Sequence, residues 1–493
     1  MTKLSAWKMV GIVSLIWAAA TAAPAQTFTT LVVFDGSNGN DSESSLIQGL
    51  DGAFYGTTEA GGDKSGGTGT AMRLTSTGEI LSLNLTPAEA RYPSAGLTLA
   101  TNGNFYGTAY YGGANYGCDG TVTTCGTVFE ITPSGEVTTL YSFCAQTNCT
   151  DGDEPRGTLV QDPNGDFYGT SFQGGTNGAG TVFKITADGT FTTLYSFCQR
   201  KNCTDGNLPG AGLILGTDGA LYGTTEWGGS ACQNDSCGII FKITPSGSLT
   251  TLHIFHGTDG WIPVGSLVQG PDGSFYGTTA DGGDLTCPGS RGGGCGTIFT
   301  MTPSGTLTTL HIFTLTDGTG PYAGLVLASD GNLYGTTSGY ENGRIYNDGT
   351  IFQITPQGSF TTLHTFNGTD GANPFGGLLQ ATNGVFYGTT STDGDMHCDE
   401  LHGCGTVFSL DMGLGPFVSF VHNPAKAGGV FGILGQGFSG TTGVSLNGVP
   451  ASFTVKSDTF LEATVPAGAT SGYVTVTTPS GTLTSNVPFH VIP

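Results

Sequence analysis

The stretch Asp166-Phe167-Tyr168-Gly169-Thr170 decides the fold, because its core recurs along most of the chain. An aromatic or aliphatic residue followed by Tyr-Gly-Thr occurs seven times, at steps of 51 to 62 residues, with the tyrosines at Tyr55, Tyr106, Tyr168, Tyr222, Tyr276, Tyr334 and Tyr387. A sustained period of this length is typical of supersecondary units that stack or are arranged around an axis. The repeat is therefore the strongest indication of the fold.

Each unit carries four short segments rich in β-branched and aromatic residues. In the third unit they are residues 157–161, 166–170, 180–185 and 191–197, separated by turn pairs such as Asn164-Gly165. Four short antiparallel strands at this period fit one propeller blade, since blade repeats run from about 40 to 50 residues. We therefore expect an all-β protein with a seven-bladed β-propeller over residues 26–412.

The segment from Phe28 to Phe34 resembles the fourth strand of the later units, yet it precedes the first complete unit. We expect it to pair with the three strands of the last unit. This pairing would close the ring and leave no open sheet edge.

Residues 1–25 have the pattern of a cleaved secretory signal. Lys3 and Lys8 give a positive start, Met9 to Ala20 form an apolar stretch, and Ala23-Pro24-Ala25 is a small-x-small cleavage pattern. The apolar stretch is too short for a spanning helix of about 20 residues. We expect an exported protein, secreted or at the cell surface, without membrane insertion after cleavage.

The charge balance limits the partners. The chain has 14 basic and 37 acidic residues among 493, a formal net charge of −23. This sign disfavours nucleic acid and anionic membrane surfaces. We expect a monomer that binds an extracellular glycan or protein.

All twelve cysteines follow the signal segment and form six pairs that are close in sequence. An even count, export and close spacing together predict disulfides. The expected pairs are Cys118 with Cys125, Cys144 with Cys149, Cys198 with Cys203, Cys232 with Cys237, Cys287 with Cys295, and Cys398 with Cys404.

Two family resemblances cover the chain. The phrases Asp-Gly-x-Phe-Tyr-Gly-Thr-Thr and Gly-Thr-Val-Phe-x-Ile-Thr-Pro-x-Gly make residues 27–412 similar to the GloVer tandem repeats of exported bacterial proteins, a family that implies no established activity. Residues 415–493 resemble the IPT/TIG family through phrases such as Gly432-Ile433-Leu434-Gly435-Gln436-Gly437-Phe438. That resemblance implies a small immunoglobulin-like β-sandwich that serves as an extracellular spacer or interaction module.

A variable position follows a proline at the start of the first strand in six units. The pattern is Pro-x-small-small-Leu, and x is Ser94, Arg156, Gly210, Val264, Tyr322 or Phe375. Asp-Gly pairs lie just upstream, at Asp151, Asp205, Asp259, Asp317 and Asp370. We expect Trp261, Tyr322 and Phe375 to form an aromatic sector at one mouth of the channel that stacks a neutral sugar, with Arg156 and the aspartates around it. The alternative is that Asp-Gly only forms turns and that the variable residues are solvated loop tips.

Metal and cofactor sites are not expected. The densest group of metal-ligand residue types consists of Asp393, Asp395, His397, Cys398, Asp399, Glu400, His402 and Cys404. Cys398 and Cys404 occupy the loop position of other local pairs, which favours a disulfide over a zinc or calcium site. On the fourth strand, His253, His311 and His364 share a position with Tyr141 and Tyr195, which favours packing over catalysis.

These features predict a secreted, non-enzymatic binding or scaffold protein that presents propeller loops to a glycan or protein. The alternative is an extracellular polysaccharide hydrolase or lyase with carboxylates at the propeller mouth, since one fold hosts many functions. A glycosidase needs two carboxyl groups about 5 to 10 Å apart. Asp151, Asp153 and Glu154 form the tight acidic group beside the expected mouth.

Overall fold

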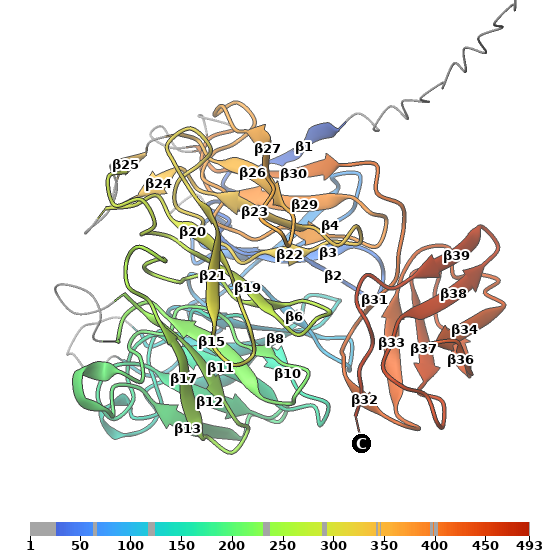
Figure 1. Cartoon of the computed structure of the whole chain (residues 1–493), viewed down its shortest axis with the longest axis horizontal. Coiled ribbons are helices and arrows are strands. Elements are labelled where there is room, and N and C mark those ends of the chain that lie inside the picture. Colours follow the sequence, from blue (N-terminus) through green and yellow to red (C-terminus); the bar gives the residue numbers. More distant parts are fainter. Residues whose placement is uncertain are drawn as a thin grey trace, which may run out of the picture.

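The computed structural model describes residues 26–62, 67–116, 124–229, 237–287, 293–341, 344–345, 347–394, 398 and 403–492. The signal segment expected over residues 1–25 lies outside the described residues. The described chain is all-β, with forty strands, two short 3₁₀ helices, η1 (Thr147–Cys149) and η2 (Lys201–Cys203), and no α-helix (Figure 1). Within these ranges, no helix has the length and apolar character needed to cross a membrane.

Seven four-stranded antiparallel sheets make up the repeat region, residues 27–412. In the third sheet, β10 (Val160–Gln161), β11 (Phe167–Ser171), β12 (Thr181–Ile185) and β13 (Phe191–Ser196) lie in chain order. A bulge between Val182 and Phe183 shifts the register of the fourth strand. These strands lie within the four segments that the sequence predicts, apart from Ser171 at the end of β11.

Five further sheets follow the same order. They are β2 (Ile47–Gln48), β3 (Phe54–Thr58), β4 (Thr70–Leu74) and β5 (Ile80–Asn84); β6 (Thr98–Leu99), β7 (Phe105–Ala109), β8 (Thr127–Ile131) and β9 (Val137–Ser142); β14 (Ile214–Leu215), β15 (Leu221–Thr225), β16 (Ile239–Ile243) and β17 (Leu249–Ile254); β18 (Val268–Gln269), β19 (Phe275–Thr279), β20 (Thr297–Met301) and β21 (Leu307–Ile312); and β22 (Val326–Leu327), β23 (Leu333–Thr337), β26 (Thr350–Ile354) and β27 (Phe360–Thr365). A two-stranded hairpin, β24 (Tyr340–Glu341) and β25 (Arg344–Ile345), is inserted between β23 and β26.

The seventh sheet joins the two ends of the repeat region. Strand β1 (Thr27–Val33) pairs antiparallel with β30 (Thr406–Asp411), which is followed in the sheet by β29 (Phe386–Thr390) and β28 (Leu379–Gln380). Figure 1 shows the blue β1 beside the orange β30. The Phe28 ring also stacks on His364 of the sixth sheet, with 3.8 Å between the ring centroids. The predicted pairing of the N-terminal strand is therefore confirmed.

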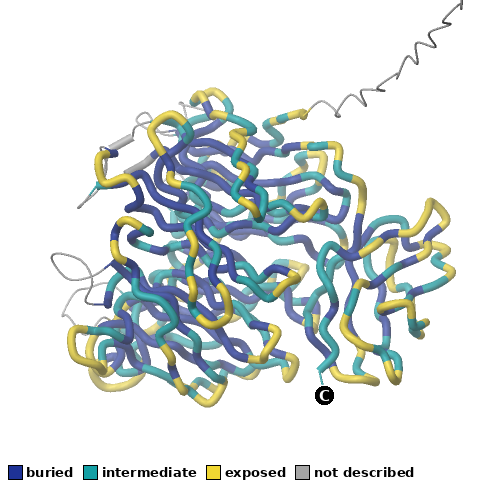
Figure 2. The backbone as a smooth tube through the Cα atoms, viewed as in Figure 1, coloured by how far each residue is buried: buried dark blue, intermediate teal, exposed yellow. Residues whose placement is uncertain are grey.

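The tyrosine of each Tyr-Gly-Thr motif packs against the neighbouring sheet. The Tyr106 ring of the second sheet lies 4.1 Å from the Phe167 ring of the third sheet, centroid to centroid. The same contact joins the last sheet to the first, where Tyr387 and Phe54 lie 4.2 Å apart. These rings are buried, and Figure 2 shows the buried stretches of backbone gathered in the interior of the repeat region. Each fully buried aromatic side chain contributes roughly 1.5–3 kcal/mol of transfer free energy.

The glycine and the threonine of the Tyr-Gly-Thr motif have different structural roles. A Cβ at Gly107 would lie 2.7 Å from the Phe129 ring of the third strand, so only glycine fits beneath that ring. The Thr108 hydroxyl donates to the Gly157 carbonyl of the next sheet at 3.1 Å. Equivalent hydroxyls at Thr57, Thr170, Thr278, Thr336 and Thr389 also donate to the next sheet. The hydroxyl of Thr224 is the exception, since it is buried without a partner among the described residues.

The inner strands approach one another closely around the centre of the repeat region. A Cβ at Gly212 would lie 2.8 Å from the Thr158 carbonyl oxygen, and one at Gly324 would lie 2.6 Å from the Ser266 carbonyl oxygen. Small residues are therefore required where the first strands meet, as expected from the small-small pairs in the sequence.

The C-terminal region contains two four-stranded sheets and one shared core. The first sheet is β31 (Ser419–Phe420), β33 (Val430–Leu434), β37 (Phe460–Thr464) and β36 (Phe453–Val455), the second is β35 (Val449–Ala451), β34 (Gly443–Leu446), β38 (Val474–Thr478) and β39 (Gly481–Thr484), and a parallel pair joins β32 (Ala425–Lys426) to β40 (Val491–Ile492). Phe431, Leu446 and Phe489 are fully buried between the sheets. The alternation of buried and exposed residues along these strands is what two packed sheets require.

The C-terminal region packs against the repeat region. Leu434 shares a buried cluster with Tyr55 and Phe105, and the Thr459 hydroxyl donates to the Leu50 carbonyl at 2.7 Å. The Gln436 amide donates to the Thr382 hydroxyl at 3.0 Å. The two regions therefore share both apolar and polar contacts.

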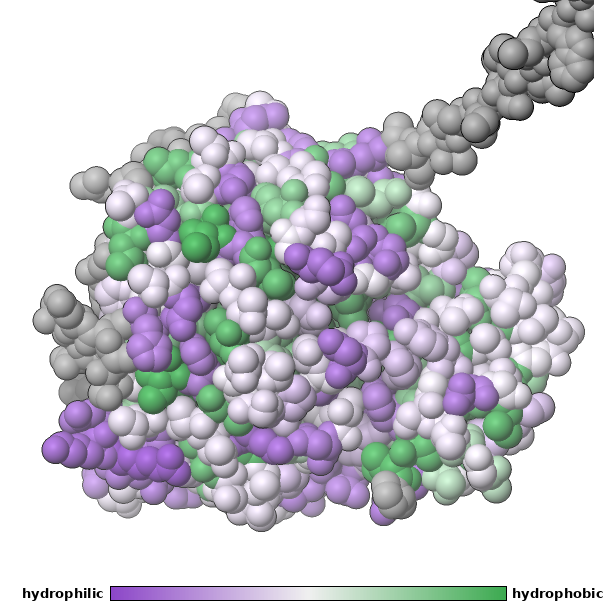
Figure 3. All heavy atoms as spheres, in the orientation of Figure 1, coloured by the Kyte–Doolittle hydropathy of each residue, from purple (hydrophilic) through white to green (hydrophobic). Residues whose placement is uncertain are grey.

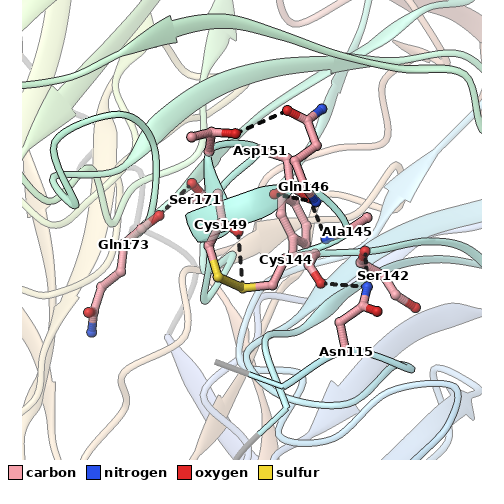
Figure 4. Close-up of a disulfide and its surroundings, with 12 residues drawn as sticks. Asn115, Ser142, Cys144, Ala145, Gln146, Cys149, Asp151, Ser171 and Gln173 are labelled. Carbon is pink, nitrogen blue, oxygen red and sulfur yellow. Dashed lines mark hydrogen bonds between the residues drawn. A yellow bond between two sulfur atoms is a disulfide. The ribbon is translucent and has the colours of Figure 1, made fainter. Parts of the chain in front are cut away.

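Local disulfides close several loops of the repeat region. Cys144 bonds Cys149 around η1 (Figure 4), Cys198 bonds Cys203 around η2, and the pairs Cys287–Cys295 and Cys398–Cys404 are also formed. These four predicted pairs are confirmed. Cys237 is disulfide-bonded as well, but Cys118 and Cys232 lie outside the described residues, so the pairs Cys118–Cys125 and Cys232–Cys237 stay predictions.

Deleting residues 28–34 removes all of β1 but Thr27, together with the buried Phe34, and leaves β30 with an unpaired edge. Because exposed edges pair with other chains, we expect the truncated protein to melt at a lower temperature and to aggregate. Circular dichroism melting and light scattering measure both effects. A Phe28→Ala variant, which loses only the ring contacts, serves as the control and should remain monomeric. A truncated protein that stays monomeric and melts at the parent's temperature would contradict the closure.

Candidate functional site

The variable residues at the start of the inner strands define one end of the repeat region, which we call the mouth. Arg156, Tyr322 and Phe375 are half-buried there, and each lies between two buried neighbours. In the first repeat, which lacks the proline, Ser42-Glu43-Ser44-Ser45-Leu46 takes the place of Pro-x-small-small-Leu. The bond from the Thr389 hydroxyl to the Ser44 carbonyl, at 3.1 Å, matches the one from Thr170 to Ala211. Glu43 therefore occupies the first repeat's variable position.

Three carboxyl groups meet beside this position. One oxygen from each of Asp41, Glu43 and Glu59 lies within 4.8 Å of the others, and all three residues are half-buried. The backbone holds them together, because the Glu59 amide donates to the Asp41 carbonyl at 2.8 Å directly after β3. We call Asp41, Glu43 and Glu59 the carboxyl triad.

The surroundings of the triad favour protonated carboxyls. Burial raises the pKa of Asp41 to about 6. Burial, and then the charge of Asp41, raise the pKa of Glu59 to about 7, while the charge of Arg156 opposes the rise. Burial also raises the pKa of Glu43 well above its usual range, and the charges of Glu59 and Asp41 add to the effect. The triad therefore favours the protonated form more than an exposed carboxyl group does, which suits a group that acts as a general acid.

Arg156 supplies the positive charge that the triad faces. Its guanidinium lies 3.7 Å from the centroid of the Phe172 ring and 4.4 Å from that of Tyr110. It also donates to the Tyr110 hydroxyl at 2.6 Å and lies 3.6 Å from a Glu154 oxygen. Ring stacking and these polar contacts fix the guanidinium in place.

The predicted aromatic sector is only partly present at the mouth. Tyr322 and Phe375 are in edge-to-face contact, with centroids 5.3 Å apart, and both are half-buried. Trp261 is only 9 % exposed and packs in a core cluster with Phe255 and Phe275. It therefore offers no open face for stacking.

The predicted aspartates contact the fourth strand of their own repeat rather than the triad. Asp151 and Asp205 accept hydrogen bonds from the hydroxyls of Tyr141 and Tyr195, at 2.8 and 2.7 Å. Asp259, Asp317 and Asp370 pair in the same way with His253, His311 and His364, at 3.0, 3.0 and 2.9 Å. Each carboxylate also accepts a backbone N–H of the adjoining loop. Either tyrosine or histidine can occupy this position, because each side chain carries a polar group that reaches the aspartate carboxylate.

The histidine contacts lower the pKa of two of these carboxylates, Asp259 and Asp317. Burial raises the pKa of Asp259, but the hydrogen bonds from His253 and the His256 amide outweigh it and hold the pKa below its usual value. The same balance lowers the pKa of Asp317. Carboxylates stabilised in this way support the loop and are poor proton donors.

The sequence alone missed the carboxyl triad. Aligning Glu43 with Arg156 and Phe375 would have placed it at the mouth. The first repeat lacks the proline, so it does not match the Pro-x-small-small-Leu pattern and was not aligned with the other six. Asp395, His397, Asp399, Glu400 and His402, from the group considered as a metal site, lie outside the described residues. Within the described part of that group, Cys398 and Cys404 form the predicted disulfide.

Solved structures of similar fold are assigned as enzymes. One assigned as a gluconolactonase is 10 % identical, with 80 % of this chain and 94 % of that chain covered at a TM-score of 0.39. Two assigned as 6-phosphogluconolactonases come from Bacteroides fragilis (18 % identity, 68 % and 87 % covered, TM-score 0.42) and Bacteroides uniformis (16 %, 66 % and 84 %, TM-score 0.41). No curated protein matches the chain.

This comparison runs against the expectation of a non-enzymatic binding or scaffold protein, since the structures that it finds carry the names of enzymes; at 10 to 18 % identity the likeness itself concerns the fold. The repeat specifies the scaffold, whereas chemistry depends on a few side chains that the repeat does not contain. The family described as the Gloeobacter/Verrucomicrobia repeat matches residues 19–234, 117–289, 198–408 and 284–451. With these overlapping matches covering most of its length, this chain belongs to the Gloeobacter/Verrucomicrobia repeat family.

Proposed function

We propose that the protein is an extracytoplasmic hydrolase of neutral polysaccharide whose reacting groups are the carboxyl triad. The observation that carries this proposal is the meeting of Asp41, Glu43 and Glu59 within 4.8 Å, with pKa values raised by burial. The scaffold we propose is a seven-bladed propeller followed by an immunoglobulin-like domain of the IPT/TIG type. The N-terminal signal pattern and the disulfides support export.

The spacing of the triad favours the retaining mechanism. Retaining glycosidases hold their two carboxyl groups about 5–5.5 Å apart, whereas inverting enzymes need about 6.5–9.5 Å to admit a water molecule. One oxygen from each residue of the triad lies within 4.8 Å of the others, which is short of the inverting separation. Carboxyl groups this close leave no room for both the sugar and the attacking water that an inverting enzyme places between them.

We assign the roles from the surroundings of the two groups. The charge of Asp41 adds to burial in raising the pKa of Glu59, so Asp41 is taken as the ionised group, and its carboxylate attacks the anomeric carbon. Glu59, at about 7, gives its proton to the leaving oxygen as the glycosidic C–O bond breaks. The ionised Glu59 then takes a proton from water, whose oxygen displaces Asp41 and releases the sugar. Glu43 keeps its own proton and can donate a hydrogen bond to the substrate.

The partners of the triad support a neutral substrate. Tyr322 and Phe375 provide a half-buried aromatic face of the kind that sugar rings stack on. The net charge of −23 repels anionic polymers. Arg156 can donate a hydrogen bond to a hydroxyl oxygen of the sugar, because its guanidinium is fixed by Tyr110 and Phe172.

We expect Glu59→Gln and Asp41→Asn each to lower the turnover of the polysaccharide substrate by at least about 100-fold, because each removes a proton-transfer or nucleophilic group. The measurement is the release of reducing ends from a panel of neutral polysaccharides. Glu136→Gln, at an exposed turn of the second sheet, is the matched control and should keep the parent's rate. Absence of hydrolysis by the parent across the panel, or full activity of both triad variants, would overturn the proposal.

Removing the Glu59 carboxyl should change how stability depends on pH. The folded-state pKa is raised from 4.5 to about 7, so the parent holds this contribution below pH 4.5 and loses it as the pH rises through 7. Relative to the parent, Glu59→Gln should therefore gain on the order of 3 kcal/mol of unfolding free energy between pH 4.5 and 8. Urea titrations at the two pH values measure this change. An equal stability difference at both pH values would show that Glu59 titrates normally.

The double change Tyr322→Ala and Phe375→Ala should raise KM about tenfold with a smaller effect on kcat, because stacking mainly binds the substrate. Trp261→Ala should instead lower the unfolding free energy by about 3 kcal/mol, as expected for a buried aromatic. Steady-state kinetics and urea unfolding separate the two effects. If the double change alters only stability, these rings are structural.

A further inference from the structure

A cleft of about 870 Å³ lies between the repeat region and the C-terminal region. Its walls on the repeat side are the turn between β18 and β19 and the turn between β22 and β23, which follow the inner strands. The mouth precedes those strands, so the cleft and the carboxyl triad lie at opposite ends of the sheets. On the other side the wall comes from Tyr473 and from residues in and after β39.

The lining of the cleft is mixed. Buried Tyr276, Leu327 and Phe417 form an apolar floor, and Tyr473 at the edge is 45 % exposed. The hydroxyl-bearing residues Thr482 and Thr484 face outward from β39. This volume is within the range of ligand sites, about 300–1,000 Å³, and apolar walls with a few polar groups are typical of them.

The charges of the lining exclude anions. Asp272 and Asp330 are the charged lining residues, both exposed, and no Lys or Arg from the described chain lines the cleft. Asp330 is already held by the Tyr334 hydroxyl at 2.9 Å and the Asn332 amide at 2.8 Å. Two rim carboxylates without a cation favour a ligand that is neutral and rich in hydroxyl groups.

One lining group lacks a hydrogen bond. The Oδ1 atom of Asn486 is buried and has no partner among the described residues, although the backbone N–H of Asn486 donates to the Val418 carbonyl. A buried acceptor left unpaired costs about 1–3 kcal/mol. A hydroxyl group in the cleft can satisfy it after a rotation of the amide, which makes Asn486 a ligand contact rather than a stabilising one.

We propose that this cleft is a second, non-catalytic binding site for a neutral oligosaccharide segment. The exposed Tyr473 ring stacks on a sugar ring, and the Asn486 amide hydrogen-bonds a sugar hydroxyl. The choice of a sugar rests on the proposed function, because a polysaccharide hydrolase benefits from a site that holds the polymer away from the reacting groups. A long chain bound here stays at the protein surface between hydrolytic events, which raises its effective concentration at the mouth.

Calorimetry with the full chain tests the cleft, using neutral hexasaccharides of β-1,4-glucan, α-1,4-glucan, β-1,3-glucan and β-1,4-mannan, with polygalacturonate as the anionic probe. The titrations are made on a background that carries Glu59→Gln, Tyr322→Ala and Phe375→Ala, so that neither hydrolysis nor stacking at the mouth contributes to the signal. We expect one of the neutral probes to bind and polygalacturonate not to bind. Tyr473→Ala should weaken that binding about tenfold. The control Tyr116→Ala removes a tyrosine that is 65 % exposed but does not line the cleft, and it should leave the binding unchanged.

Asn486→Ala separates a binding role from a structural one. Because the Oδ1 atom is unpaired, its removal should leave the melting temperature unchanged or higher while weakening binding at least fivefold. Binding that survives both Tyr473→Ala and Asn486→Ala, or the absence of binding by every neutral probe, overturns the cleft proposal. If the parent protein hydrolyses none of the polysaccharides but the cleft still binds a neutral probe, the proposed function alone is overturned. Dimerisation that Tyr473→Ala abolishes, seen by sedimentation, would instead assign the cleft to a second copy of the chain and overturn the proposal.

Discussion

The contact that the rest of the structure depends on is made by the second strand of each sheet. Its tyrosine packs on the next sheet, as Tyr106 does on Phe167. In six of the seven sheets its threonine hydroxyl donates to the segment that leads into the next sheet's first strand, as Thr108 does to Gly157. Both contacts need a neighbour, so an isolated repeat would leave an aromatic ring and a hydroxyl exposed. The first and last sheets of the repeat region therefore contact each other, so that every sheet has a neighbour. Tyr387 and Thr389 of the last sheet contact the first sheet in the same way, and β1 completes the last sheet.

This arrangement confines chemical variation to the ends of the strands. Positions between sheets carry tyrosine, glycine and threonine. The half-buried variable position accepts arginine, glycine or tyrosine after the proline, and glutamate in the first repeat, which has no proline there. The outer surface in Figure 3 shows hydrophobic and hydrophilic residues interspersed, with no single dominant patch on that face. A concentrated chemical feature such as the carboxyl triad is therefore conspicuous in this protein.

The acidic residues fall into two classes according to their partners. The aspartates near the fourth strands each accept a bond from tyrosine or histidine and from a backbone N–H, so their charge is stabilised. The triad has no such donors among the described residues, and burial, joined by charge repulsion at Glu43 and Glu59, raises the pKa of its carboxyl groups. Holding like charges together costs folding free energy, and sites of this kind are commonly functional. The partner, rather than the residue type, distinguishes a structural carboxylate from a reactive one.

The sequence by itself determined the strands, the sheet order, the pairing of β1 and the local disulfides, because these depend on residue patterns repeated seven times or lying close along the chain. It also located the mouth, through the variable position after the proline. Only the tertiary structure decided which residues act there. Asp41 and Glu59 are separated by a whole hairpin, Arg156 comes from another repeat, and Trp261, although near the same motif, turns into the core. Proximity across sheets and burial set the proton affinity of a carboxyl group, and neither can be read from its neighbours in the chain.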